Sequence, residues 1–149
     1  MLQLKICCNF AAVMNNTRFA TLIHILTLLA KHPEEWISSE WISGSIGINP
    51  AVVRKELSFL QEKGWVVSKK GKEGGSKLNK SSCDISLGEL YLGVKNSTVL
   101  GKKNASTAVN CSVGKQINKE LEELFNETDQ LVLKALEKKS LKAFVAQFK

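Results

Sequence analysis

Metal ligands and long apolar runs are scarce in this sequence of 149 residues. Its four cysteines form no CxxC pair and it has only two histidines, His24 and His32, so their spacing does not supply the four ligands of a structural zinc site. The longest apolar stretch near the N-terminus covers 12 residues, 19–30, which is too short to cross a bilayer and is typical of a buried helix. With only two prolines, the composition differs from that of disordered or collagen-like chains. We therefore expect a folded protein without a metal site or a membrane association.

The N-terminus also lacks a clear export signal. Residues 1–13 contain one lysine, a broken apolar run and no clean small-residue cleavage site. We predict a cytoplasmic protein whose cysteines are free, reduced thiols.

The net charge of +7 is concentrated in one part of the chain. Residues 49–80 carry eight lysines and arginines against three glutamates, or +5, whereas residues 1–48 are neutral and residues 81–114 and 115–149 carry +1 each. Such clustering is the electrostatic footprint of a nucleic-acid-binding face, although a solvated basic loop would give the same count.

Three helices are predicted in the first half of the chain. From Asn15 onward, apolar residues recur at three- and four-residue steps. Ser38 and Ser39 stand where the N-cap of a short second helix belongs, and Asn49 followed by Pro50 begins a third. Two short helices joined by a glycine-containing turn and packed on a longer helix form a helix-turn-helix, in which the third helix is the candidate recognition helix. Helices that merely pack together would give the same pattern.

A basic hairpin is predicted directly after these helices. The run KKGKEGGSKLNKS, residues 69–81, follows the strand-like segment 65–67. Its three glycines permit a tight turn and a close approach of the backbone to another surface, and its lysines ring the tip, where they can meet phosphates. A phosphate-binding P-loop is excluded because the GxxxxGK[ST] order is absent. The hairpin is therefore interpreted as a wing, with a plain flexible loop as the alternative.

A long amphipathic helix is predicted from about Val113 to residue 138, after a polar, flexible loop at residues 96–112. Its apolar stripe is too long for a small winged domain to cover, so pairing with the same helix of a second chain would bury it in a two-fold dimer. The alternative is a helix folded back over the first helix of its own chain. The candidate interface residues are Ile117, Leu121, Leu124, Leu131, Val132 and Leu136.

These segments together resemble the Rrf2 family of bacterial transcription regulators. The resemblance covers residues 14–149 and rests on NNTRFATLIHILTLLA, INPAVVRKELSFLQEKGWVVSKKGKEGGSKL, CDISLGELY, NCSVGKQI and SLKAF in that order. It implies a mainly α fold with a small β-wing: a winged helix-turn-helix domain at residues 14–95 and a dimerisation helix with a final short helix at residues 113–149. Family members usually start near Met14, so residues 1–13 are interpreted as an N-terminal extension and a candidate for disorder.

The resemblance further implies a homodimer that binds double-stranded DNA at a dyad-symmetric operator and regulates transcription, as a repressor in our interpretation. Lys70 and Ser76 replace an arginine and a tyrosine that are common in the family, so the wing is expected to contact phosphates rather than to read the minor groove through a guanidinium. The candidate DNA-binding residues are Arg18, Ser38, Ser39, Asn49, Pro50, Arg54, Lys55, Lys69, Lys70, Lys72, Gly74, Gly75 and Lys77.

The loop before the long helix indicates whether the chain can bind an iron–sulfur cluster. Cluster-binding members of the family hold iron and sulfur with three cysteines in this loop, whereas this chain has one, Cys111, and no histidine there. We therefore expect no cofactor. Cys111 precedes the long helix, a position at which a thiol can become redox-sensitive, and an inert cysteine is the alternative.

No combination of nucleophile, base and orienting group stands out, so no enzymatic activity is expected. The other class of function compatible with the sequence is a basic winged-helix module that binds protein or RNA without operator specificity. Such a module would show a steep salt dependence and no sequence preference.

Overall fold

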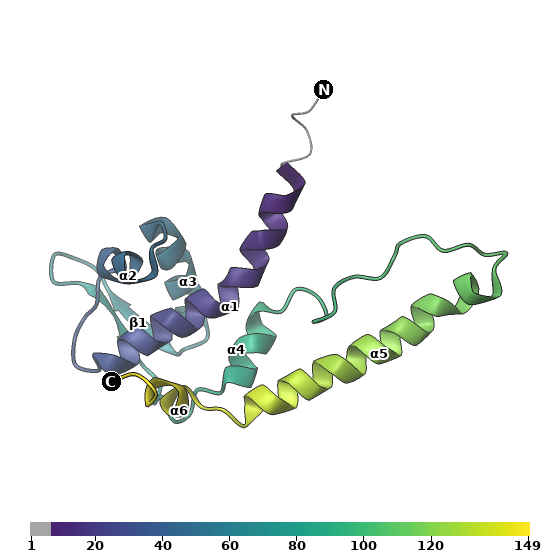
Figure 1. Ribbon diagram of the computed structural model, residues 1–149. Helices are drawn as coiled ribbons and strands as arrows, with labels where there is room; N and C mark the ends of the chain where they lie inside the picture. The colour runs from purple at the N-terminus through teal and green to yellow at the C-terminus, as the bar shows by residue number, and fades with distance from the viewer. Residues whose placement is uncertain (1–6) are drawn as a thin grey trace.

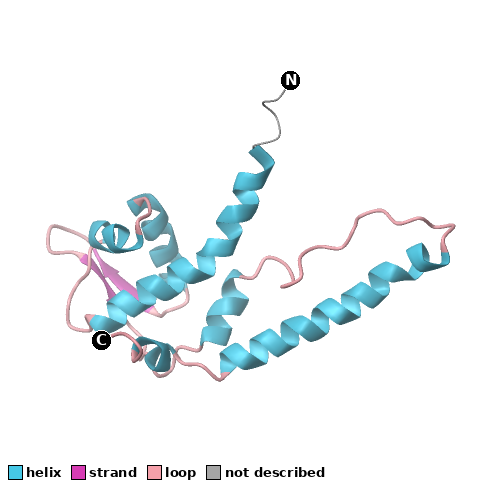
Figure 2. Ribbon diagram, viewed as in Figure 1, coloured by secondary structure: helices cyan, strands magenta, loops and turns pink. Residues whose placement is uncertain are grey.

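Six helices and two strands make up the part of the chain that the structure describes. This computed structural model describes the backbone of residues 7–149 and the side chains of residues 17–149. The elements are α1 (Cys7–Lys31), α2 (Ser39–Ile46), α3 (Pro50–Glu62), β1 (Val66–Lys69), β2 (Gly75–Leu78), α4 (Leu87–Val94), α5 (Ser112–Glu137) and α6 (Leu141–Val145) (Figures 1 and 2). The predicted mainly helical fold with a small β-wing is confirmed.

Helix α1 begins earlier than its apolar pattern indicates. Its first residue is Cys7 rather than Asn15, because the segment between them contains no glycine or proline that would end a helix. Of the predicted extension, residues 1–6 lie outside the described residues, and the backbone of the remainder is helical.

Local capping sets where several helices begin. The Ser38 hydroxyl accepts a hydrogen bond from the backbone N–H of Trp41 at 3.1 Å, and the Asn49 side-chain oxygen accepts one from Ala51 at 2.8 Å. Between these caps, Gly47 adopts a left-handed conformation with φ 76°, which ends α2 and turns the chain into α3. The helix-turn-helix is therefore specified by a few local residues.

The hydrophobic core is built around the C-terminal half of α1. Leu22, Ile25, Leu26 and Leu29 recur at three- and four-residue steps and are fully buried, as the sequence indicates for a buried helix. The same cluster takes side chains from every layer that surrounds α1: Ile42, Val53, Leu60, Val66, Leu90 and Leu141. The recognition helix, the wing, α4 and α6 thus share one core.

The wing consists of β1, β2 and the turn at residues 70–74. Its strands pair antiparallel, with Val66 opposite Leu78 and Lys69 opposite Gly75. On its other side, β2 is hydrogen-bonded to the residue two positions before α2: the N–H of Ile37 donates to the Ser76 carbonyl at 3.0 Å, and the N–H of Ser76 donates back at 2.8 Å. The hairpin prediction agrees with the structure, and the wing is attached directly to the helix-turn-helix.

Two close backbone approaches explain the glycine pair of the wing. A Cβ atom at Gly74 would overlap the carbonyl oxygen of Lys69 across the turn. A Cβ atom at Gly75 would lie 2.7 Å from the carbonyl oxygen of Ile37. Larger residues at either position would therefore have to displace the turn or the strand pairing.

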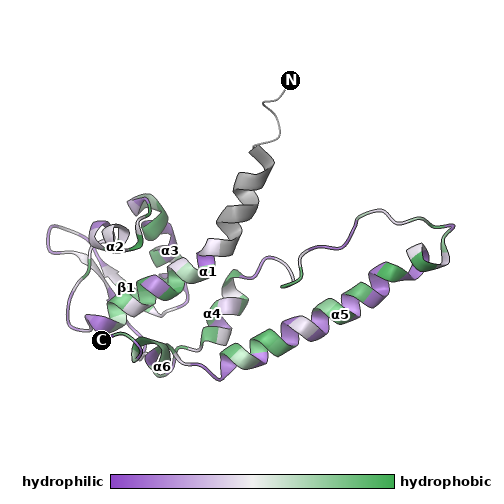
Figure 3. Ribbon diagram, viewed as in Figure 1, coloured by the Kyte–Doolittle hydropathy of each residue, from purple (hydrophilic) through white to green (hydrophobic). Residues whose placement is uncertain are grey.

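Helix α5 packs on α4 and extends away from the rest of the chain (Figure 1). Helix α6, rather than α5, packs on α1, which disagrees with the alternative of a long helix folded back over the first. Figure 3 shows hydrophobic residues along the length of α5, yet Asp129 is the only buried residue of this helix. None of the helices in the described residues is both long enough and apolar enough to cross a membrane.

The loop that precedes α5 is attached to that helix at several points. The N–H of Val99 donates to Asp129 at 2.8 Å, the Lys103 ammonium lies 2.7 Å from Glu122, and the Asn118 amide donates to the Asn104 carbonyl at 3.1 Å. The loop is irregular up to Cys111, and its flexibility stays a prediction.

Candidate nucleic-acid interface

A groove of about 460 Å³ lies between the helix-turn-helix and the wing. Its walls come from the start of α2, the exposed face of α3, and the wing. We call it the helix–wing groove. It brings together eight of the 13 predicted DNA-binding residues: Ser38, Ser39, Arg54, Lys69, Lys70, Lys72, Gly74 and Gly75.

Arg54 is the arginine of the recognition helix that faces this groove. Its Nη1 donates to the Glu40 carboxylate at 2.9 Å and to the Ser39 hydroxyl at 3.3 Å, and the Ser39 hydroxyl donates to Glu40 at 3.1 Å. Both partners lie at the start of α2, so these exposed contacts direct the guanidinium toward that end of α2.

Glu40 is a groove residue that the sequence analysis missed. Hydrogen bonds from its own backbone N–H and from the Ser39 hydroxyl, together with the charge of Arg54, lower the pKa of Glu40. An acidic residue in the first turn of a helix is favourable there in any protein, so the sequence alone gave no sign of its pairing with Arg54.

The lysines of the wing fall into two groups. The ammonium groups of Lys69 and Lys77 lie over the ring of Trp36, 5.9 and 5.1 Å from its centre, so both are held against this ring. Lys70 and Lys72 are exposed and take part in no ion pair with residues 17–149. These two side chains at the tip can reach a phosphate without breaking a contact.

Three further predicted residues lie on α3 or at its start, outside the lining of the groove. Asn49 caps α3 and Pro50 occupies its first position. Lys55 is exposed next to Arg54. Asn49 and Pro50 thus form the N-terminal end of the recognition helix, and Lys55 adds one more cation to its side.

Arg18 is placed differently from the other predicted residues. Its Nε donates to both carboxylate oxygens of Glu56 at 3.0 and 2.9 Å, and its guanidinium stacks 4.6 Å from the centre of the Phe59 ring. Since Glu56 is buried on α3, this pair ties α1 to the recognition helix. The structure thus gives Arg18 a positioning role, and its contact with DNA stays a prediction.

Replacing Arg18 by methionine should therefore destabilise the fold. The change keeps an apolar stem over Phe59 but leaves the buried Glu56 carboxylate unpaired, at a cost of about 1–3 kcal/mol in the free energy of unfolding. Urea denaturation followed by circular dichroism would measure it.

Arg54→Met is the matched control, because its ion pair with Glu40 is exposed and should contribute little. Equal stability of the two variants would contradict the structural role of the Arg18–Glu56 pair.

In the described part of the chain, none of the six predicted interface residues of α5 is fully covered. Leu124 and Leu131 are 51% and 69% exposed, and the other four, Ile117, Leu121, Val132 and Leu136, are half-buried. Within one chain, the stripe is therefore left without a covering layer.

The described residues do not fit an iron–sulfur cluster. Cys111 is exposed at the N-cap position of α5, and Cys83 is exposed before α4. Among the residues that the structure describes, no three His, Cys, Asp or Glu side chains lie close enough together to hold a metal ion. A redox role of Cys111 stays a prediction.

Comparisons with known proteins agree with this arrangement. Residues 15–147 match the Rrf2 family, described as iron-dependent transcriptional regulators. The chain is 38% identical to YwnA of Bacillus subtilis (strain 168) over 129 residues. These residues cover 87% of this chain and 95% of YwnA, which is named as an HTH-type transcriptional regulator.

Solved structures share the fold. A crystal structure from Lactobacillus plantarum superposes with a TM-score of 0.76 at 24% identity, covering 88% of this chain and 89% of the other. CymR (YrzC), the global cysteine regulator of B. subtilis, superposes with a TM-score of 0.65 at 19% identity, covering 89% and 96%. From the matched residues and the shared fold, the chain belongs to the Rrf2 family of winged-helix transcription regulators.

Proposed function

We propose that this chain is a sequence-specific DNA-binding repressor of transcription that acts as a homodimer, without an iron–sulfur cluster and without enzymatic activity. The observation that carries the proposal is the helix–wing groove, where Arg54 of the recognition helix and the exposed Lys70 and Lys72 of the wing line one space. As a transcription regulator of a bacterial family, the protein would act in the cytoplasm, where the chromosome lies.

Each wall of the groove supports a different kind of contact with DNA. With α3 in the major groove, the Arg54 guanidinium can donate to O6 and N7 of a guanine. The wing lysines and the start of α2, with Ser38 and Ser39, can contact phosphates on either side and set the register. Base reading is thus assigned to α3, and positioning is assigned to its neighbours.

The apolar stripe of α5 supports the homodimer. A second copy that lays its own α5 against Leu124 and Leu131 would remove both side chains from water. A two-fold arrangement would then present two recognition helices to half-sites about 34 Å apart, as a dyad-symmetric operator requires.

The loop before α5 supports a regulator without a cluster. One thiolate, Cys111, cannot replace the three cysteines with which cluster-binding relatives hold iron. The signal for this member would then be sensed by other groups of the chain.

Selection of genomic DNA fragments by the purified full chain, in reducing buffer near physiological salt, tests the proposal. We expect enrichment of a few promoter fragments that share a short inverted repeat, with affinity at least about 10³-fold above that for bulk DNA. Uniform recovery of fragments would instead favour the basic interaction module, which binds through charge alone.

Removing the two charges at the tip of the wing should weaken binding to every duplex. For Lys70→Ala with Lys72→Ala, we expect the slope of log affinity against log salt concentration to fall by about 2, because each phosphate contact adds about 0.9 to it. Titrations of operator and random duplexes at several salt concentrations would measure both effects.

Lys138→Ala with Lys139→Ala is the charge-matched control, since both side chains are exposed outside the helix–wing groove. An unchanged slope in the wing variant would exclude the tip from the DNA contact.

A further inference from the structure

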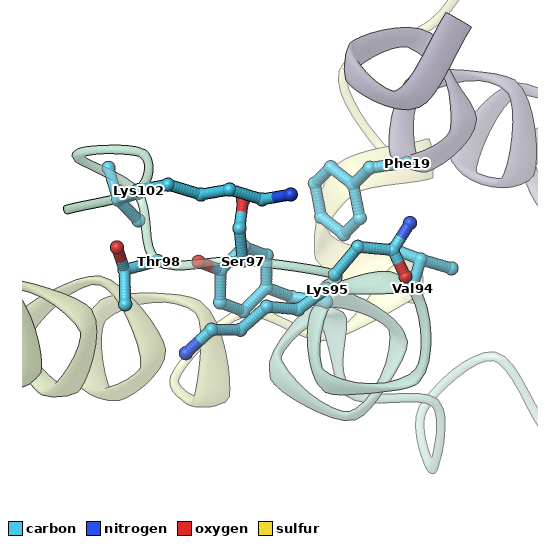
Figure 4. Close-up of a pocket in the computed structure, with 9 residues that line it drawn as sticks. Phe19, Val94, Lys95, Ser97, Thr98 and Lys102 are labelled. Atoms are coloured by element: carbon cyan, nitrogen blue, oxygen red, sulfur yellow. The ribbon is translucent and has the colours of Figure 1, made fainter. Parts of the chain in front are cut away.

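A second hollow lies where α1, α4 and the loop before α5 meet. It encloses about 360 Å³ and shares no residue with the helix–wing groove. Phe19 of α1, Tyr91 and Val94 of α4, and Ser97 and Lys102 of the loop are among its walls (Figure 4). We call it the loop cavity. Its volume lies in the range of small-molecule sites.

One side of the loop cavity is apolar. The rings of Phe19 and Tyr91 meet edge to face with their centres 6.0 Å apart, and Val94 is buried beside them. Burial, and then the charge of Asp129, raise the pKa of Tyr91. Its hydroxyl can donate a hydrogen bond. This side would accept the apolar or aromatic body of a ligand.

The two lysines of the cavity differ in their freedom. Lys95 is turned toward α5, where its ammonium pairs with Asp129, and this contact together with the N–H of Val99 lowers the pKa of Asp129. Lys102 reaches across the cavity toward Phe19 and forms no ion pair with residues 17–149 (Figure 4). Among residues 17–149, one positive charge therefore faces the apolar wall without an ion-pair partner.

We propose that the loop cavity binds a small organic acid, with its carboxylate on Lys102 and its apolar body against the wall that Phe19 and Tyr91 form together. A single free ammonium matches a single negative charge, and hydroxyl groups such as that of Ser97 offer further hydrogen bonds. Because Lys102 is exposed, a neutral molecule of the same shape would gain no charge–charge attraction from it.

The cavity is also connected to both parts of the regulator. On one side, Phe19 follows Arg18, whose pair with Glu56 ties α1 to the recognition helix. On the other side, Lys95 and Val99 both contact Asp129 of α5. If the proposed function holds, a ligand here would alter the geometry between α3 and α5 and, through it, the affinity for the operator.

Benzoate, compared with its neutral analogue benzamide, tests the site with the full chain. A titration followed by amide NMR shifts should give a benzoate Kd on the order of 1 mM, with the shifts centred on residues 91–102. Benzamide should bind more weakly by at least about tenfold. Equal binding of the two probes, or no benzoate binding at that level, would overturn the proposal.

Lys102→Gln should weaken benzoate binding by about tenfold or more, and Lys103→Gln should leave it unchanged. Lys103 is the matched control, because it is adjacent in the loop but pairs with Glu122 and does not line the cavity. Equal effects of the two substitutions would contradict the assigned carboxylate position.

The effect of the ligand on operator affinity is tested separately from ligand binding in the cavity. Benzoate should change the affinity of the wild type for an operator fragment and should leave that of Lys102→Gln unchanged. If benzoate binds in the cavity while operator affinity stays constant, the ligand site stands and its regulatory role is overturned. If the chain binds no operator at all, the NMR titration still decides the site.

Discussion

Leu124→Glu combined with Leu131→Glu is expected to leave the chain monomeric and to lower operator affinity by about 10²- to 10⁴-fold, the usual gain from linking two binding modules. Both side chains are exposed in one chain and lie seven residues apart on one face of α5. Their replacement should therefore leave the folded body intact, while a dimer would have to bury four carboxylates. Sedimentation velocity and operator titration would measure the two effects.

Gln116→Glu combined with Gln130→Glu provides the control for this variant. The two glutamines are exposed on α5 and point away from the apolar stripe, so the substitutions add the same charge to a different face. We expect this control to remain dimeric. A Leu124→Glu, Leu131→Glu variant that still sedimented as a dimer would show that another surface joins the subunits.

Arg54→Ala should lower affinity for the operator by about 10- to 100-fold and affinity for random duplexes far less. The reason is that a bidentate contact with guanine discriminates between bases, whereas a phosphate contact does not. Competition binding with operator and shuffled duplexes at one salt concentration would measure the difference.

Lys55→Ala is the control for Arg54, because this neighbour is also an exposed cation on α3 but does not line the helix–wing groove. It should weaken binding to both duplexes to a similar degree. If Arg54→Ala also lost affinity for the operator and for the shuffled duplex to a similar degree, Arg54 would contact only the DNA backbone.

The sequence predicted the elements that depend on local chemistry. Caps such as Ser38 and Asn49 satisfy backbone groups within their own helices, and Gly74 acts within its own turn, so their effect is visible in a short window. The start of α1 was misplaced because the amphipathic pattern reports burial, whereas a helix continues until a residue or a tertiary contact ends it.

Contacts between distant residues could not be predicted from the sequence. The DNA contact predicted for Arg18 stays a prediction, and no sequence pattern indicated that its Nε pairs with Glu56, 38 positions away in sequence. Glu40 and Trp36 had no distinguishing pattern, and their relation to Arg54 and to the wing lysines depends on how the helix-turn-helix and hairpin meet. The loop cavity likewise depends on Phe19 meeting residues 91–102, which are far from it along the chain.

The pair of hydrogen bonds between Ile37 and Ser76 has a consequence for the duplex itself. Because they fix the wing to the residues just before α2, the distance between recognition helix and wing is set before DNA arrives. A duplex that contacts both the recognition helix and the wing must then adopt the matching curvature and groove width. Deforming stiff base steps in this way costs more free energy than deforming flexible ones. Base pairs that no side chain touches would thus contribute to operator choice through their deformability.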